Sequence, residues 1–500
     1  MLEAQLFFVL YLIALIVIAY YSSKKIKIET FMQDYYLAGR GLGAWVVGMV
    51  AMSALASGGT LIGTPSIVWG YGFVGGLWQT QGFMYGLIAV GIIGKRIAEL
   101  SGRVNAISLT DLMRERFGRG TGIICTIIII AVLFPYAAAQ FVASARVLEV
   151  TLGIDYVAGI ITFAVIIALY LSLGGIRAQM FTSVIQSVLM LIAAVVGMIV
   201  VLVVLGGLGP ITTALGQQNP EFLIPPGPDG WMPIPFYISY GIMLPAFAAM
   251  GQPHVVTRFF ALGPKQSYRV TMFTGGAVTI LWFLPLVIIG LGARAIFPEL
   301  ASPDFAFPMI ALELFPAFIA GIFLAGMVAA MMSTVDAMLL TVSASFTKDI
   351  YQRVLNPQAS GQKLRLAGIL STLVLSVGAI IIALYPPDFV LFLVLAAFGT
   401  FGVSFGPAII AGLFWKRANA HGAFASMLIG FVVTAGLHLP MIPTNPLGFH
   451  AVGWGGIASV LALFIVTLLT PPSEISVLRK FYSAREVTEV NTGEDASLPT

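Results

Sequence analysis

A carboxylate in the middle of an apolar run is the group best placed to do chemistry in this sequence. Asp336 lies in the stretch AAMMSTVDAMLL, residues 329–340, directly after the hydroxyl residues Ser333 and Thr334. A charged group in hydrocarbon is costly, so Asp336 is expected to face protein or water and to have a partner. Two interpretations stay open. The three residues serve a cation, or the hydroxyls bond back to their own helix while Asp336 pairs with a structural donor.

The depth and chemistry of this group favour a hard monovalent cation. Lys348 marks the end of the apolar run, and about 12 residues at ~1.5 Å each place Asp336 roughly 18 Å away, at mid-membrane depth. Hydroxyl and carbonyl oxygens suit Na⁺, especially beside an unwound helix that supplies free carbonyls. The four histidines are scattered and Cys125 is the single cysteine, so a transition-metal site is not indicated.

The composition is that of a protein embedded in lipid. The chain of 500 residues is 59% hydrophobic and 9% charged, with a mean hydropathy of +0.99. A soluble protein with this balance has too little polar surface to stay in solution. We therefore expect one transmembrane domain over residues 1–470. A short cytoplasmic tail over 471–500 is expected to be disordered, because its end is acidic and polar.

The hydropathy pattern predicts an all-α integral membrane protein with about 13 transmembrane helices. The first apolar run has no basic segment before it and no small-residue cleavage site, so it is interpreted as a retained helix. The expected spans are 3–22, 44–70, 73–94, 121–147, 155–173, 178–206, 235–257, 270–297, 314–346, 364–385, 388–415, 422–439 and 449–470.

The placement of basic residues predicts the orientation. If the N-terminus is outside and the C-terminus is cytoplasmic, all of the 25 Lys and Arg residues except Arg146 and Arg294 fall on the cytoplasmic side. This bias is the one that cytoplasmic loops of membrane proteins carry. The stretch from Arg258 to Arg269 is among the segments assigned to cytoplasmic loops. The segment 207–235 has two acids and no Lys or Arg, so it is assigned to the outside.

Two of the expected helices are interrupted by glycine and proline. The second contains SALASGGTLIGTP, residues 53–65, and the seventh contains MLPAFAAMGQPH, residues 243–254. Such residues free backbone groups that need partners inside the protein. The two helices are five spans apart and so run in opposite directions, as an inverted repeat of helices 2–6 and 7–11 requires. The alternative is that these residues only allow close packing or a kink.

Three further polar residues are candidates for a site near these breaks. His254, in GQPH, is either a proton carrier or substrate contact or else a structural hydrogen-bonding group. Tyr136 and Gln140 lie one turn apart on the fourth expected helix and so share a face. Packing alone could use both, and we lean toward a site.

Several motifs resemble those of the sodium:solute symporter family. GLFWKRANAHGAFASMLIGFV, residues 412–432, is similar to a signature of that family, as is YLSLGGIRA, residues 170–178. ASARVLE, residues 143–149, and FPAFIAGIFLAGMVAAMMST, residues 315–334, look most like bacterial sodium/pantothenate symporters. GQPHVVTRFFA, residues 251–261, looks more like sodium/proline symporters. The likeness extends over nearly the whole chain.

The resemblance implies a fold and a set of site residues. The family's fold is a five-plus-five inverted repeat, here about 44–206 and 235–415, with flanking helices. Its sodium site joins carbonyls of the broken second helix to the ninth helix. Carried over without gaps from LIG at 61–63, the sodium ligands are Ser53, Ala56, Ala330, Ser333 and Thr334. A gapped register moves the first pair to Ala56 and Gly59. The implied substrate-binding residues are Ser57, Gly58, Gly59, Thr60, Tyr136, Gln140, Gly251, Gln252 and Pro253.

The chain also departs from the family pattern. Ser183 stands where many relatives carry an acid on the sixth helix, and Asp336 stands where relatives carry a neutral residue. We therefore assign Asp336 to ion coupling, as a replacement for the charge that Ser183 lacks. Near the second-helix break, Leu55 or Gly58 stands where proline transporters have an acid. Pro245 and Ala249 replace the aromatic residues expected around proline, which disfavours that solute.

These observations predict a Na⁺-coupled secondary symporter, not an enzyme, that imports a small organic solute by alternating access. A small carboxylate, pantothenate or a monocarboxylate, is favoured because N–H groups at helix breaks suit an anion. The alternatives are a proline-like sodium/amino-acid symporter and a proton-coupled variant using Asp336. An ion channel is the rival from another class, but no repeated pore loop or charged ring is present. The expected partners are the solute, Na⁺ and the lipid of the bacterial inner membrane. No organic cofactor or nucleic acid is expected, and a monomer is expected to be functional.

Overall fold

The computed structural model describes most of the chain in helical form. The described residues are 41–54, 57–80, 89–243, 251–263, 266–385, 390–438 and 446–482, with Leu10, Tyr11, Ile13, Ala14, Val17, Tyr20, Tyr21 and Phe247. Among these residues the only β pairing is one isolated parallel bridge between Leu42 and Leu262. The all-α class predicted from hydropathy is confirmed for this part of the chain.

Eight helices in the described residues are long and apolar enough to cross a membrane. A bent pair of helices adds a ninth candidate if it is counted as one span. Seven of the predicted spans correspond, within a few residues, to seven of the eight. They are α9 (Arg119–Leu152), α15 (Tyr268–Ile296), α17 (Ala317–Ser345), α18 (Gly361–Ala383), α19 (Val390–Phe414), α20 (Ala420–Leu437) and α21 (Ala451–Leu469).

The fifth and sixth predicted spans differ from the structure in one respect. The sequence predicted separate helices at 155–173 and 178–206, whereas the backbone is helical throughout α10 (Tyr156–Leu205), which has 50 residues. Within α10, Thr182–Leu205 is long enough to span a membrane and Tyr156–Ile167 is a shorter apolar segment. The sequence predicted that a loop around Arg177 interrupts the helix. This prediction was wrong, because the backbone remains helical there. The first predicted span, 3–22, and part of the third, 73–94, lie outside the described residues.

The second predicted helix is interrupted where its glycines predicted a break. Helix α3 (Ala44–Ser53) ends before helix α4 (Gly58–Leu61) and helix α5 (Gly63–Thr80), and the chain bends by 68° at this break. Within α5, Gly72 has φ 60°, a conformation that favours glycine, and it separates the second and third predicted spans.

The seventh predicted helix also changes conformation where its proline stands. A π-helical segment, η5 (Tyr237–Met243), and helix α14 (Pro253–Phe260) occupy the two ends of this span. Gln252, the residue before α14, is extended with φ −77° and ψ 108°. A residue that precedes proline is pushed out of the helical region, and proline is well suited to the first position of a new helix.

Several short helices lie in segments that were interpreted as loops. The π-helical η2 (Ala89–Gly94) forms the end of the third predicted span and runs into α7 (Lys95–Arg103), which with α8 (Leu109–Phe117) lies in a predicted loop. Helix α11 (Leu208–Gln218) lies in the segment assigned to the outside. Helix α16 (Ala306–Leu314) and the π-helical η7 (Phe346–Leu355) flank α17. Helix α22 (Ile475–Phe481) lies in the tail predicted to be disordered, and its Leu478 and Phe481 are buried. The tail prediction was therefore wrong for 475–481.

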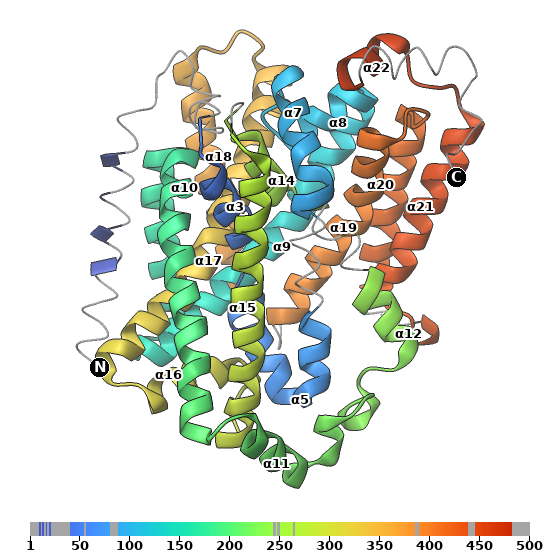
Figure 1. The fold of residues 1–500 in the computed structure, drawn as a ribbon. Helices are drawn as coiled ribbons and strands as arrows, with labels where there is room; N and C mark the ends of the chain where they lie inside the picture. Colours follow the sequence, from blue (N-terminus) through green and yellow to red (C-terminus); the bar gives the residue numbers. More distant parts are fainter. Residues whose placement is uncertain are drawn as a thin grey trace.

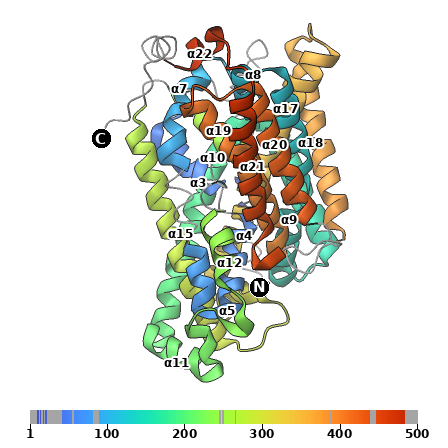
Figure 2. The same ribbon diagram turned by 90° about the vertical axis from the view of Figure 1, so that its right-hand side faces the viewer.

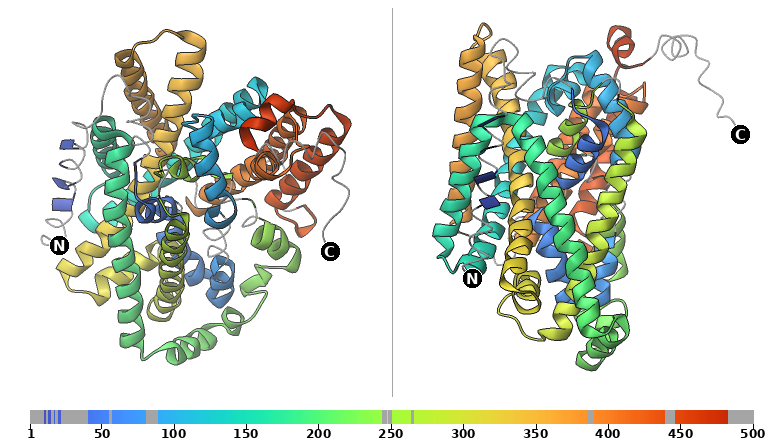
Figure 3. Two further views of the ribbon diagram at one scale, coloured as in Figure 1. Left: turned by 45° about the horizontal axis from the view of Figure 1, so that its top comes forward. Right: turned by 60° about the vertical axis from the view of Figure 1, so that its left-hand side comes forward.

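The long helices run roughly alongside one another, with α7, α8 and α22 at one end and α11 at the other (Figure 1). A view turned by 90° shows α19, α20 and α21 packed together (Figure 2). In the same view α5 and α11 lie toward the end opposite α8 and α22, and α12 (Ile234–Phe236) lies near mid-height. Two further views show these C-terminal helices grouped at one side (Figure 3).

Helix α17 forms the centre of the bundle. Nearly every residue from Ala320 to Ser345 is buried, because this helix is apolar on all faces and packs against α9, α10 and α18. Gly326 lets α10 approach closely, at Leu189 and Ala193. The polar residues of α17 are therefore held inside the protein and not against lipid.

Candidate functional site

Four of the five residues predicted as sodium ligands have oxygens that meet at the break in the second helix. Ser333 Oγ lies 3.2 Å from the carbonyl oxygen of Ser53, the last residue of α3. The same hydroxyl lies 2.8 Å from the carbonyl oxygen of Ala330, and Thr334 Oγ1 lies 3.1 Å from that carbonyl. All four residues are fully buried. Ala56, the fifth predicted ligand, lies outside the described residues.

The chemistry of this cluster fits an alkali-metal ion. Its ligands are two carbonyl and two hydroxyl oxygens without formal charge, which are hard donors. No group of three or more His, Cys, Asp or Glu side chains that could hold a metal occurs in the described part of the chain. The cluster joins the end of α3 to α17, a helix that is buried over nearly its whole length, so a cation held there would fix their separation.

The start of helix α4 is tied to α9 by Gln140. Gln140 Oε1 accepts a hydrogen bond of 2.8 Å from the backbone N–H of Gly58, and Ser57 Oγ caps α4 by accepting one of 3.1 Å from Gly59. The backbone N–H of Thr60 donates to Ser57 O. Gln140 Nε2 is buried with no hydrogen-bond partner among the described residues. The predicted substrate residues of α4 and α9 are thus adjacent.

Tyr136 and His254 connect the two breaks. Their rings meet edge to face at 5.8 Å, and Tyr136 packs in the same way on Phe398 of α19 at 5.4 Å. The hydroxyl of Tyr136 lies beside Ser57, and the imidazole of His254 lies beside the backbone of Ala54. Neither the hydroxyl nor a ring nitrogen makes a hydrogen bond of normal geometry to a described residue.

The break in the seventh helix packs directly on α19. Gln252 Nε2 donates a hydrogen bond of 3.2 Å to the carbonyl oxygen of Phe398, and Gln252 Oε1 has no partner in the described regions. Gly251 lies so close to the backbone at Phe401 that any side chain would clash with it. Pro253 is the first residue of α14. Phe398 was not predicted as a site residue, and only the small residues around it in LAAFGTFG, residues 395–402, hinted at close packing.

Asp336 lies about one turn beyond the sodium cluster, and no described residue pairs with it. Its side chain is 0% exposed, and neither carboxylate oxygen has a hydrogen-bond partner among the described residues. Tyr11 lies within electrostatic reach of Asp336. The Tyr11 hydroxyl accepts a hydrogen bond of 3.2 Å from Gln186 Nε2. The sequence predicted a partner for Asp336, but no basic side chain among the described residues pairs with it.

The sequence did not predict that Arg258 is buried against α10. Arg258 had been assigned to a cytoplasmic loop, but it belongs to α14 and is 1% exposed. Its Nη1 donates to Gln179 Oε1 at 2.6 Å, and Gln179 Nε2 donates to Ser183 Oγ at 2.7 Å. Its Nε and Nη2 have no partner in the described part of the chain. Gln179 and Gln186 are two turns apart on an apolar helix, a spacing that could have indicated this face.

Fold and site together define a class of protein. Two interrupted helices meet inside an apolar helical bundle, and buried groups with unused hydrogen-bonding capacity surround their breaks. Interrupted membrane helices with polar groups at the breaks are the means by which secondary transporters bind ions and solutes. The arrangement is thus that of a membrane transporter.

Comparison with known proteins gives the family. The family model named "Sodium:solute symporter family" matches residues 35–430. The chain is 32% identical over 466 residues to the sodium/pantothenate symporter of Escherichia coli, which covers 93% of this chain and 96% of that protein. It is 30% identical over 475 residues to an osmoregulated proline transporter of Bacillus subtilis, covering 92% and 94%. The chain belongs to the sodium:solute symporter family.

A solved structure supports the same fold. A Na⁺-coupled sialic acid symporter, in a substrate-bound outward-open state, matches with a TM-score of 0.79 at 18% identity, over 94% of this chain and 98% of that one. At that identity the likeness shows the fold alone. By family, the chain is a multi-pass membrane transporter that moves Na⁺ together with a small solute, and it is not an enzyme.

Proposed function

We propose that this symporter imports a small carboxylate, pantothenate or a monocarboxylate, with Na⁺ bound between α3 and α17. The observation that carries the proposal is the contact between the Ser333 hydroxyl and the Ser53 carbonyl. This contact supports a sodium site made of Ser53, Ala330, Ser333 and Thr334, with Ala56 as the expected fifth ligand. In the bound state the lone pairs of the two hydroxyls would face the ion.

Sodium binding at this place would organise the solute site. Helix α4 begins five residues after Ser53, and its first N–H is already held by Gln140 of α9. A cation that fixes the end of α3 against α17 therefore restricts Ser57 and Gly58 as well. The coupling must be reciprocal, so solute should tighten Na⁺ binding by the same factor.

The unused hydrogen-bonding groups indicate what the solute offers. Gln140 Nε2 and the Tyr136 hydroxyl are donors that a carboxylate would accept from, and Gln252 Oε1 would accept from a hydroxyl or amide of the solute. The expected use of helix-break N–H groups needs revision, because Gln140 and Ser57 already take those of Gly58 and Gly59. Side-chain donors, with the positive charge of nearby Na⁺, therefore carry anion recognition in this proposal. His254 is proposed as a further solute or proton contact.

The architecture proposed for transport has 13 helices, with inverted repeats over helices 2–6 and 7–11. The N-terminus is proposed to lie outside and the C-terminus in the cytoplasm of a bacterial inner membrane, with the monomer as the working unit. The bias of Lys and Arg along the sequence supports this orientation. The breaks at 53–58 and at Gln252 support the repeat, because they fall in corresponding helices.

A proton-coupled variant is the second candidate, and Asp336 favours it. An isolated buried carboxylate is stable only when it is neutralised by a cation or by a proton. Asp336 sits three residues after Ser333, so either ion reaching the sodium cluster is close to it. We propose Asp336 as an ion-coupling residue in both cases. A proline-like amino-acid symporter has the support of the 30% identity to a proline transporter.

Transport by purified protein in proteoliposomes tests these proposals. Uptake of radiolabelled pantothenate, lactate, pyruvate and proline is measured under an inward Na⁺ gradient, under an inward H⁺ gradient and with neither. We expect saturable, Na⁺-dependent uptake of one carboxylate and counterflow of that solute. Uptake of proline alone would refute the carboxylate assignment, and solute-independent Na⁺ flux that does not saturate would indicate a channel.

A further inference from the structure

A cavity of about 450 Å³ opens between α8, the beginning of α9 and η7, away from the transport site. It lies at the end of the molecule that carries α7, α8 and α22 (Figure 1). It is lined by hydroxyls, charged groups and apolar side chains, namely Thr110, Arg114, Arg119, Thr126, Arg353 and Ile127 among others.

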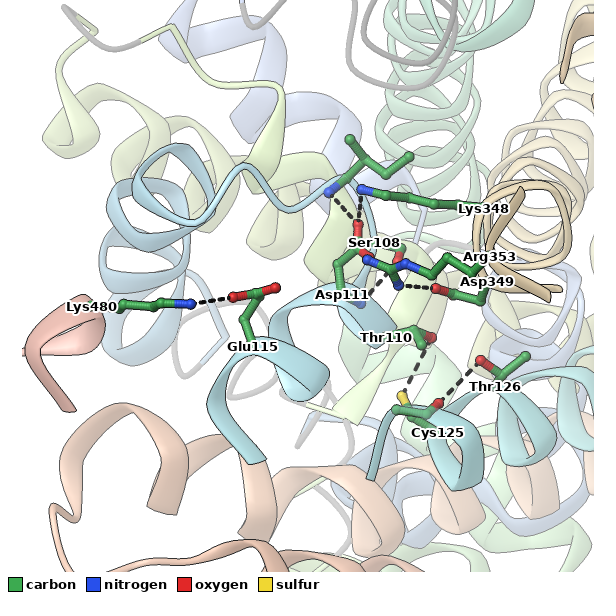
Figure 4. Close-up of polar contacts among 12 residues, drawn as sticks. Ser108, Thr110, Asp111, Glu115, Cys125, Thr126, Lys348, Asp349, Arg353 and Lys480 are labelled. Carbon is green, nitrogen blue, oxygen red and sulfur yellow. Dashed lines mark hydrogen bonds and ion pairs between the residues drawn. The ribbon is translucent and has the colours of Figure 1, made fainter. Parts of the chain in front are cut away.

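Most charges around this cavity neutralise one another. Asp111 of α8 pairs with Lys348 and Arg353 of η7, and Arg353 also pairs with Asp349 (Figure 4). Glu115, on the same helix, pairs with Lys480 of α22 at 2.9 Å. Two acids and two bases therefore cancel in the η7 network, and the remaining acid of α8 has its own partner.

Arg114 and Arg119 are left with a net charge of +2 at the cavity. Neither forms an ion pair with an acid within the described ranges. Arg114 packs its aliphatic stem over Gly122 of α9 and lines the cavity. Arg119 is the first residue of α9, so the partial positive charge of that helix end adds to its own. An anion bound between these two guanidinium groups would balance their charge.

The apolar wall of the cavity is exposed on the outside of the bundle. Ile123 and Ile127 follow Arg119 at intervals of four residues, so the three side chains form one strip along α9 that is ~12 Å long. The isoleucines are 49% and 52% exposed, and Val354 across the cavity is 64% exposed. A ligand that satisfies the whole cavity has an anionic head at the arginines and a hydrocarbon chain along the isoleucines.

We propose that this cavity binds the headgroup of an anionic phospholipid, with the phosphate between Arg114 and Arg119 and an acyl chain along Ile123 and Ile127. Thr110 and Thr126 also line the cavity, with the Thr110 hydroxyl donating to Cys125 Sγ and the Thr126 hydroxyl to the carbonyl oxygen of Gly122. Basic pockets at one face of a transmembrane bundle are the usual means of holding such headgroups. The bound lipid bridges α8, α9 and η7, and so connects the end of the central helix α17 to the bilayer.

Native mass spectrometry of the full-length protein in detergent tests the proposal. The protein is titrated with phosphatidylglycerol, with phosphatidylethanolamine of the same acyl chains, and with soluble glycerol phosphate. We expect one phosphatidylglycerol to bind at least ~10-fold more tightly than either of the other two. Equal binding of the two lipids would overturn the proposal. Equal binding of glycerol phosphate would assign the cavity to free phosphate esters and would also overturn it.

Paired variants locate the lipid. Arg114→Gln with Arg119→Gln should weaken phosphatidylglycerol binding by ~10-fold or more, while Arg114→Lys with Arg119→Lys should retain most of it. Lys363→Gln with Arg365→Gln removes the same charge from exposed positions of α18 and should leave binding unchanged. Ile123→Ser with Ile127→Ser should weaken binding of the lipid but not of glycerol phosphate. Unchanged binding in the Gln pair would refute the site.

An acidic peptide is the competing occupant. The last part of the sequence contains four acidic residues, Glu486, Glu489, Glu494 and Asp495. Removal of residues 483–500 should leave lipid binding unchanged if the cavity belongs to lipid. If the full-length protein binds no lipid here and the shortened protein does, the cavity belongs to the tail and the proposal fails.

Discussion

The hydroxyl of Ser333, in the middle of α17, lies 3.2 Å from the backbone carbonyl oxygen of Ser53, where α3 ends. The two residues are 280 positions apart in the sequence. A helix that continued past Ser53 would use that carbonyl for its own ladder, so the break at this residue is what frees it for a partner. The contact therefore depends on both the glycines after Ser53 and the hydroxyl of the central helix.

Replacement of Ser333 by alanine should weaken sodium binding at least ~10-fold, because one of four described oxygen ligands is lost. The measurement is the Na⁺ concentration for half-maximal uptake, together with the Na⁺-dependent rise in melting temperature, which needs no transport. Ser343→Ala is the matched control, since Ser343 is a buried serine of the same helix whose hydroxyl donates to Gly368 O. Equal Na⁺ responses in the two variants would rule out the sodium site.

Replacement of Gln140 by leucine should raise the solute KM by ~10-fold or more and leave Na⁺ binding nearly unchanged. The variant removes the acceptor that holds the N–H of Gly58 and the free donor Nε2, both on the solute side of the break. Ser144→Ala is the control, because the Ser144 hydroxyl bonds to the Gln140 backbone one turn away. If KM is unchanged while the Na⁺ response falls, Gln140 serves the ion and not the solute.

Replacement of Asp336 by asparagine tests whether this carboxylate takes part in ion coupling. The variant removes a buried charge that has no partner in the described regions but keeps the shape of the side chain. We expect fewer cations per solute, seen as a shallower dependence of uptake on Na⁺ or as a lost response to an H⁺ gradient. Asp229→Asn, at an exposed position of the short 3-10 helix η4 (Pro228–Gly230), is the control. Unchanged transport with unchanged Na⁺ dependence would exclude a coupling role.

The sequence predicted the long helices well because each is a continuous apolar run, and α15, α17 and α21 begin and end within a few residues of their predicted bounds. The breaks were also predictable, because glycine and proline act locally. The way in which side chains of different helices pack against one another could not be predicted. Arg258 looks like a loop residue by charge, and only packing shows that Gln179 of α10 receives it inside the bundle. Phe398 carries no sequence signal for its place against Tyr136.

Short amphipathic helices were missed for a related reason. Helices α7, α8 and α22 are too short and too polar for a hydropathy window, so their charged residues were interpreted as loop. In the structure α8 is held by specific contacts. Arg116 alone donates to the carbonyl oxygens of Gly412 and Ala418, and it lies over the ring of Phe117.

Asp111 connects α8 to η7, which continues the central helix α17. Its side chain is 2% exposed and pairs with both Lys348 and Arg353. Replacement by asparagine removes the acid paired with Lys348 and one of the two acids paired with Arg353, which keeps Asp349. Breaking a buried ion pair typically costs ~3 kcal/mol. We therefore expect a melting temperature several degrees lower in detergent.

Glu115 provides the matched control on the same helix. Its pair with Lys480 is exposed on both sides, at 33% and 53%, and exposed pairs contribute little because water screens them. Glu115→Gln should therefore shift the melting temperature by less than a third of the Asp111→Asn shift. Equal shifts would mean that α8 is held by its apolar contacts and by Arg116, and that the η7 ion pairs contribute little to the stability of this end of the bundle.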